Sequence, residues 1–287
     1  MPIWKSLLLN FYYCGSFPHR VWRNAQLRDH GRAPVMVLFY HRVADDRASP
    51  WTISTSMFER QIRWLKRHFD MISLAEAQHR VLGRNHRPCV AITFDDGYAD
   101  NCRRALPLLI EEQIPCMYFV SSRHVIEDVP FSHDVAIGRP LAPNTPRQIR
   151  DMALAGIDIG AHTRTHADLG RITDPNELVD ELVGARLELE DLTGASVRYF
   201  AFPYGQHANL STAAFQLARI AGYEGVCSAY GGYNCPGDDP FHLQRIPVDG
   251  DMIRLKNWTM FDPRKLRSTR RYEYQNQPFA DVRGVCA

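Results

Sequence analysis

The 287-residue sequence lacks any apolar run long enough to cross a membrane, and it contains no repeat or low-complexity tract. The apolar and aromatic run at residues 7–14 is short and has no small-residue cleavage site after it, so it does not predict a cleavable signal peptide. These absences favour a cytoplasmic or membrane-peripheral location. Apolar residues at 45% and charged residues at 23% exclude a disordered or fibrous chain and predict one main domain with a substantial core.

Cysteine is sparse and irregularly placed. The seven cysteines are an odd number, and no two of them have C-x-x-C spacing. This pattern suggests neither a disulfide framework nor a thiolate zinc site, and it favours a reducing compartment. The cysteines are Cys14, Cys89, Cys102, Cys116, Cys227, Cys235 and Cys286.

An excess of charge of one sign is also missing, since 34 Lys and Arg oppose 32 Asp and Glu, and we expect no nucleic-acid partner. The charges are nevertheless segregated. Residues 1–34 hold five basic residues against one acidic residue, and residues 254–287 hold eight against three, which leaves the middle with 21 against 28. The acidic middle is where we expect the chemistry.

This segregation predicts three regions. Residues 34–260 form the main domain, residues 261–287 form a basic tail, and residues 1–33 form a basic segment rich in aromatic residues. Trp4 and Trp22 lie in this N-terminal segment among Tyr and Phe, beside Arg20 and Arg23. It is expected either to lie at a membrane interface as a peripheral contact or to pack as a helix on the main domain. The sequence indicates no oligomeric state.

Short apolar runs alternate with amphipathic segments from about residue 35 onward, which is the rhythm of an α/β protein with parallel strands. Ser73 and Asp174 are predicted helix caps, the latter followed by a Pro in the first turn. Residues 121–147 are predicted to form a long loop with substrate contacts. Seven or eight strands result, enough to close a barrel. The expected strands are residues 35–40, 90–94, 117–120, 157–159, 199–202, 225–227 and 243–246.

Two carboxylates stand at the end of the strand predicted at residues 90–94. Asp95 and Asp96 are followed by Gly97, and strand ends are where parallel α/β folds place their chemistry. Since successive side chains of a strand point to opposite faces, the two carboxylates are expected to do different work. Alone, an Asp-Asp-Gly sequence is also typical of an ordinary turn.

Two histidines follow another predicted strand. His162 and His166 are four residues apart, and Thr163 and Thr165 between them can hold the loop by local hydrogen bonds. Two imidazoles and one carboxylate suit a divalent transition metal and leave a position open for water and substrate. Together with Asp96, the pair predicts a metal site, for Zn²⁺ first and for Co²⁺, Mn²⁺ or Ni²⁺ as alternatives.

A third motif, Phe202-Pro203-Tyr204-Gly205, follows the strand predicted at residues 199–202. Pro restricts one backbone angle and Gly permits an unusual one, so the turn can aim the Tyr204 N–H into a cleft. Such an amide can stabilise an oxyanion, with Phe202 and Pro203 in the same binding site. An ordinary loop with a packed aromatic residue is the alternative.

In this order, the motifs resemble those of the NodB-type polysaccharide deacetylase family, over roughly residues 34–250. The resemblance implies a distorted, incomplete (β/α) barrel and hydrolysis of the N-acetyl amide of an N-acetylhexosamine, or sometimes of an O-acetyl ester. It implies Asp95 as the general base and the Tyr204 N–H as an oxyanion donor. The implied metal ligands are Asp96, His162 and His166.

Two departures from the family pattern stand out. Many members have an Arg at the position of Ala201, where it orients the base, and the late Leu-x-His element that usually holds the acid has no clear match. The segment 243–246 instead resembles the late strand of a subgroup without that His. His41, at the end of the first predicted strand, is the expected general acid, with His133 and His242 as weaker candidates.

Two other functions stay open at this point. A barrel that binds carbohydrate without turnover would explain Ala201 and the missing late His. A hydrolase of a small amide or a cyclic C–N bond would keep the site and change the substrate. The loop 121–147 and the segment 228–262 would distinguish them, since the aromatic residues of the latter can stack on sugars or pack in the core. Those aromatic residues are Tyr230, Tyr233 and Trp258.

Overall fold

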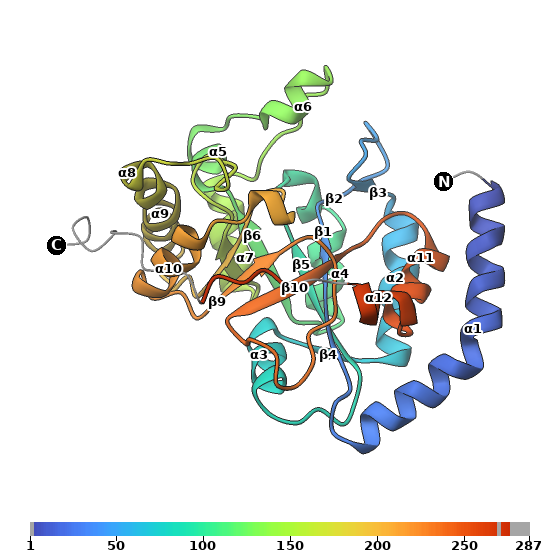
Figure 1. The fold of residues 1–287 in the computed structure, drawn as a ribbon. Helices are drawn as coiled ribbons and strands as arrows, with labels where there is room; N and C mark the ends of the chain where they lie inside the picture. The colour runs from blue at the N-terminus through green and yellow to red at the C-terminus, as the bar shows by residue number, and fades with distance from the viewer. Residues whose placement is uncertain (1–2, 269–270, 276–287) are drawn as a thin grey trace.

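The computed structural model of the protein describes residues 3–268 and 271–275. Most of the predicted basic tail, and Cys286 with it, lies outside the described residues. Figure 1 shows a barrel of strands surrounded by helices, with a long N-terminal helix along one side.

The barrel is a ring of seven parallel strands. They are hydrogen-bonded in the order β1, β10, β9, β8, β7, β6, β5, and β5 pairs back onto β1. An eighth strand, β4, pairs with the first half of β5 outside the ring. The predicted (β/α) barrel of seven to eight strands is confirmed, one strand short of a full eight-stranded ring. The strands are β1 (Val35–Tyr40), β4 (Asp70–Ile72), β5 (Cys89–Phe94), β6 (Cys116–Val120), β7 (Asp158–Ala161), β8 (Tyr199–Ala201), β9 (Gly225–Ser228) and β10 (His242–Pro247).

Alternation along the strands divides the core into two layers. Val35 and Val37 of β1 pack inside the barrel with Ala91 and Phe119, whereas Met36 and Leu38 face the surrounding helices. Both faces of each strand are therefore buried, which explains why the strands read as continuous apolar runs. Apolar side chains of α3 (Leu74–Leu82) join the inner layer and close the amino-terminal end of the barrel.

The helices begin where local hydrogen bonds favour them. The predicted caps are confirmed, since the Ser73 side chain accepts a hydrogen bond from the Glu76 N–H and the Asp174 side chain accepts one from the Asn176 N–H. The remaining helices are α1 (Ile3–Asp29), α2 (Thr55–His68), α4 (Ala105–Glu111), α5 (Ser122–Glu127), α6 (Ser132–Ala136), α7 (Pro146–Leu154), α8 (Pro175–Val179), α9 (Ala185–Thr193), α10 (Thr212–Ile220), α11 (Met252–Thr259) and α12 (Pro263–Ser268). In the described part of the chain, no helix combines the length and the apolar character of a membrane span.

Two segments differ from their sequence-based expectations. The loop predicted at residues 121–147 contains α5 and α6, which are too short to show a clear helical period in the sequence. The helix predicted from residue 174 onward is interrupted by a π-helical turn, η2 (Asp180–Gly184), between α8 and α9. Such turns insert one extra residue into a helix and are frequent at functional sites.

Candidate active site

All three sequence motifs lie at the carboxyl ends of barrel strands, after β5, β7 and β8. A cavity of about 130 Å³ opens between them. Residues at the end of β1 and Trp51 complete its wall. Trp51 lies in the connection between β2 (Arg42–Val43) and β3 (Thr52–Ile53), which form a small second sheet. The carboxyl end of a parallel barrel is where its loops converge, so distant segments meet there. The cavity is lined by Phe39, His41, Trp51, Asp95, Asp96, His133, His162, His166, Phe202, Tyr204 and Ala229.

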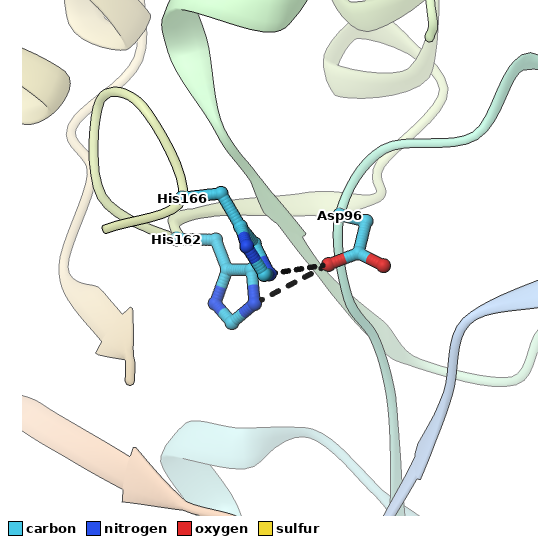
Figure 2. Close-up of side chains that lie close together, drawn as sticks. All are labelled: Asp96, His162 and His166. Atoms are coloured by element: carbon cyan, nitrogen blue, oxygen red, sulfur yellow. Dashed lines mark ion pairs between the residues drawn. The ribbon is translucent and has the colours of Figure 1, made fainter. Parts of the chain in front are cut away.

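The carboxylate and the two imidazoles predicted as metal ligands meet at one point (Figure 2). Asp96 Oδ1 lies 3.2 Å from His166 Nε2 and 3.4 Å from His162 Nε2. One ligand atom from each of the three residues lies within 4.8 Å of the others. The residues come from two different strand ends, β5 and β7, which lie on either side of β6, so the order of the strands in the sheet brings them together.

The geometry of this cluster fits a tetrahedral cation. Ligands at about 2.0–2.1 Å from Zn²⁺ are about 3.3 Å apart in a tetrahedron, close to both distances to Asp96 Oδ1. That oxygen is buried and has no hydrogen-bond partner among the described residues, although buried oxygens are normally satisfied. His162 Nδ1 donates a hydrogen bond at 2.8 Å to the Ala201 carbonyl oxygen, which leaves Nε2 free to bind a metal. The family-implied cation therefore fits the residues present.

Electrostatics keep Asp96 ionised. Burial raises the pKa of its carboxyl, but the neighbouring imidazoles of His162 and His166 outweigh burial and hold the pKa well below its usual value. A carboxylate is the form that binds a metal ion, so the cluster is prepared for a cation.

Backbone strain is concentrated at the site. Eight non-glycine residues of the described chain have positive φ, and four of them belong to the three motifs. These are Asp96 at 72°, Thr163 at 58°, His166 at 62° and Tyr204 at 60°. The left-handed region is unfavourable for residues with a Cβ and persists where the surroundings impose it, typically at functional sites.

Glu181 holds the loop that carries the two histidines. Its carboxylate accepts hydrogen bonds at 2.9 Å from the N–H groups of Arg164 and Thr165, and it also accepts one from the Thr165 hydroxyl at 2.5 Å. Glu181 is buried in the π-helical turn η2. Sequence reasoning missed this residue, because a Glu within an amphipathic helix gives no sign of facing inward.

Asp95 lines the same cavity as the metal cluster and pairs with Arg245 of β10. Arg245 Nη1 donates to Asp95 Oδ1 at 2.5 Å and Nη2 donates to Oδ2 at 2.8 Å. The guanidinium is fully buried between the rings of Phe39 and Phe119, 4.7 and 5.2 Å from their centroids. Burial raises the pKa of Asp95, but Arg245 outweighs it, so the net shift is downward. Arg245 thus orients Asp95 where Ala201 cannot.

The turn after β8 presents Tyr204 to the cavity. Its ring centroid lies 5.1 Å from that of His166, and no described residue accepts a hydrogen bond from its N–H. Gly205 allows the turn, because it has a φ of 59° and a Cβ there would lie 2.6 Å from the Ala229 nitrogen. The turn is thereby held against the end of β9.

The three histidines considered as general acid are in different surroundings. His41 lines the cavity, and its imidazole has no hydrogen-bond partner among the residues that the structure describes. His133 also lines it, but Tyr98 Oη lies 2.9 Å from its Nε2, and burial lowers its pKa. His242 lies outside the cavity, 2.9 Å from Ser228 Oγ, and burial lowers its pKa to about 3.

The two variable segments contribute unequally. From the loop 121–147, His133 reaches the cavity, and Trp51 of the β2–β3 connection packs on it with ring centroids 5.0 Å apart. From the segment 228–262, only Ala229 lines the cavity. Tyr233 is buried and its hydroxyl donates a hydrogen bond to the backbone carbonyl of Trp258 in α11, so the aromatic residues of this segment pack in the core instead.

A parallel barrel that gathers a carboxylate and two imidazoles beside a second, separately held carboxylate is the arrangement of a metal-dependent hydrolase. Comparison with known families agrees with this class. Polysaccharide deacetylase is the family that matches residues 83–226, half of the chain, and the chain belongs to it. The family resemblance of the motifs is therefore confirmed, and the chain is a hydrolase of acetylated glycans.

The similarity to known proteins extends beyond residues 83–226. The chain is 24% identical over 225 residues to the poly-beta-1,6-N-acetyl-D-glucosamine N-deacetylase of Staphylococcus aureus (strain N315), covering 74% of this chain and 73% of that protein. YxkH of Bacillus subtilis (strain 168) is 23% identical over 232 residues, 80% of this chain and 76% of its own. The structure of IcaB from Ammonifex degensii is 26% identical with a TM-score of 0.66, covering 80% and 98% of the two chains.

Proposed function

We propose that this chain removes N-acetyl groups from a polymer or glycan precursor that contains N-acetylhexosamine, with Asp95 as the base. One observation carries the proposal: the cluster of Asp96, His162 and His166 shares its cavity with Asp95, whose carboxylate is bound by Arg245. A lone metal cluster would suit many functions. A separate ionised carboxylate beside it suits the removal of a proton from water.

The residues divide the hydrolysis between them. Asp96, His162 and His166 would hold a divalent cation, Zn²⁺ as the first candidate, which polarises the acetyl carbonyl and increases the acidity of water. Asp95 takes a proton from the water while the water oxygen forms a bond to the carbonyl carbon. The Tyr204 N–H donates to the carbonyl oxygen as negative charge develops there.

The leaving nitrogen must be protonated before the C–N bond breaks. His41 is the proposed donor, because it lines the cavity and its imidazole has no hydrogen-bond partner among the described residues. Proton transfer to the nitrogen allows the electron pair of the C–N bond to leave with it, so the products are acetate and the amine of the sugar. Asp95 retains the proton of the water until it is lost to solvent.

The cavity walls support a sugar substrate. Trp51 and Tyr204 lie at the cavity, and aromatic faces pack well on the apolar faces of sugar rings. The name of the Staphylococcus aureus relative supports a β-1,6-linked polymer of N-acetylglucosamine as the first substrate to test. A non-catalytic barrel is not favoured, since a pure binding protein has no need for a separately held base.

The direct test measures acetate release by the purified protein supplied with Zn²⁺, Co²⁺, Mn²⁺ or Ni²⁺. The substrates are β-1,6- and β-1,4-linked N-acetylglucosamine oligomers, an O-acetylated glycan and a small acetamide. We expect release from an N-acetylated oligomer. Saturable glycan binding without acetate would establish the binding barrel, and turnover confined to the small amide would establish the alternative hydrolase.

The role of His41 predicts a split between two substrates. In His41→Gln, hydrolysis of the N-acetyl amide is expected to fall about 100-fold or more, because an amine is a poor leaving group without a proton donor. Hydrolysis of p-nitrophenyl acetate is expected to change little, because its phenolate leaves unprotonated. The measurement is kcat for both substrates.

His133→Gln is the matched control, since it changes another histidine of the same cavity. It is expected to retain more amide hydrolysis than His41→Gln. The reverse order would assign the acid to His133 instead. Equal losses on the amide and the ester in His41→Gln would reject proton donation to the leaving group.

The Asp95–Arg245 pair predicts a shift in pH dependence. In Arg245→Met, Asp95 loses the cation that lowers its pKa while remaining buried, so its pKa rises. The base must be ionised, so the acidic limb of the kcat/KM profile is expected to move to higher pH, and kcat to fall about 10- to 100-fold. Arg245→Lys keeps the charge but not the bidentate geometry and should shift the limb less. An unmoved limb in Arg245→Met would reject this positioning role.

A further inference from the structure

The outer face of α1 is apolar, and no described residue covers it. Six large apolar side chains are exposed there in two groups, at residues 4–11 with the three- and four-residue spacing of one helix face and at residues 21–22, with Trp4 65% and Phe11 76% exposed. Exposed apolar surface of this kind marks an interaction site more often than isolated exposed residues do. We call these residues the α1 stripe: Trp4, Leu7, Leu8, Phe11, Val21 and Trp22.

The opposite face of α1 is fixed to the protein. Tyr12 Oη donates to Asp262 Oδ1 at 2.7 Å, and the buried Arg20 donates to the Asn257 backbone and side-chain oxygens at 2.9 and 2.7 Å. These bonds join α1 to α11 and to the start of α12. Rotating the helix to bury the stripe would break these hydrogen bonds. The bonds therefore hold the stripe on the outside of the protein.

The charges that flank the stripe are of one sign. Between residues 3 and 28 the helix contains no acidic residue, and Lys5, Arg23 and Arg28 are exposed. An exposed apolar stripe with cationic flanks complements an anionic lipid surface. Two copies of this chain paired along their stripes would bring mostly like charges together, since Asp29 at the end of α1 is its one acidic residue, and this disfavours a second copy as the occupant.

The helix lies along the side of the barrel. Near its start, Ser6 and Asn10 line a groove with the residues 250–253 that follow β10, at the end of the barrel where the cavity opens. At its other end, Arg32 forms a bridge with Asn85, just before β5 begins. Figure 1 shows α1 bent, and Pro18 within it removes an internal hydrogen bond, the usual cause of a kink.

We propose that the α1 stripe binds the surface of an anionic lipid bilayer, with the helix lying in the interface and the barrel resting on it. Trp4 and Trp22 stand near the two ends of the stripe, and tryptophan favours the boundary between apolar and aqueous phases. This contact is independent of the proposed chemistry, because no residue of the α1 stripe lines the cavity.

The test is flotation of the full-length protein with vesicles of phosphatidylcholine alone and of phosphatidylcholine mixed with phosphatidylglycerol. Wild type is expected to float with the anionic vesicles, and its tryptophan emission to shift to the blue. Leu7→Glu with Phe11→Glu should lower binding more than about 10-fold. Lys5→Gln should lower it about fivefold, and added salt should weaken it further.

Leu154→Glu is the matched control, since Leu154 is 79% exposed on α7 and far in sequence from α1. It should bind vesicles as wild type does. Hydrolysis of a soluble substrate should be unchanged in all these variants, which shows that they fold and separates this test from that of the proposed function. Equal binding of wild type and the double variant would overturn the proposal. So would a wild-type dimer in sedimentation that the double variant abolishes, since a second copy would then cover the stripe.

Discussion

Asp95→Asn is expected to lower kcat for deacetylation by about 1,000-fold while leaving the amount of bound metal unchanged. An amide cannot accept a proton from water at neutral pH, so the variant loses the base. It keeps the metal site, because the Asp95 carboxylate bonds Arg245 rather than the two histidines of the cluster. Acetate release and metal content per chain, measured on the same sample, test both halves of this expectation.

Loss of stability must be separated from loss of chemistry in this variant. Replacing Asp95 leaves the Arg245 guanidinium buried without its counter-charge, which is expected to destabilise the fold. Asp100→Asn is the matched control, because Asp100 also pairs with a fully buried arginine, Arg42, at 2.6 Å but does not line the cavity. It should keep most of the activity, with a smaller cost in melting temperature because Arg42 also pairs with Asp46. Similar activity in the two variants would show that Asp95 acts only through the fold.

The second large effect is expected in Asp96→Ala, where the metal dissociation constant should rise more than about 100-fold and acetate release should be lost with it. Removing a partner of a metal ligand already costs about 10- to 100-fold, and a direct ligand should cost more. Binding of a cation to the folded state raises the melting temperature, so added Zn²⁺ should stabilise wild type and not the variant. Calorimetric titration and thermal unfolding with and without Zn²⁺ measure these effects.

The apo variant gives an independent check. Without metal, the imidazoles of His162 and His166 still stabilise the Asp96 carboxylate, so the variant should lose some melting temperature and should not regain it when Zn²⁺ is added. His133→Gln serves as the control for metal binding, since His133 lies in the cavity but outside the cluster. A chelator should inactivate wild type, and added Zn²⁺ should restore it. Unchanged metal binding in Asp96→Ala would place the cation elsewhere.

The metal cluster and the base could be predicted because each motif is local. Asp95 and Asp96 follow one strand, and His162 and His166 follow another, so the strand pattern alone places all four at the same end of a parallel barrel. Both carboxylates line the same cavity, but they have different partners, since Asp95 pairs with Arg245 and Asp96 faces the two histidines. The structure adds the distances between Asp96 and the two histidines.

The partner of Asp95 could not be predicted in this way. Arg245 is 150 residues from Asp95 in sequence and reaches it because β1 lies between β10 and β5 in the closed ring. Within an apolar strand, an arginine can be read as an edge residue or as a buried ion-pair partner. The choice depends on which face of β10 turns inward, which strand pairing sets.

The sequence by itself determined the barrel class, the order of its strands along the chain and the residue types of the site, because these depend on local periodicity and on contiguous motifs. Tertiary structure alone decided that Arg245 replaces the missing arginine, that Glu181 holds the histidine loop and that the α1 stripe faces outward. Those outcomes depend on contacts between segments far apart in sequence. The register of these segments and the direction of their side chains are determined only when the strands pair into a ring and the helices pack around it.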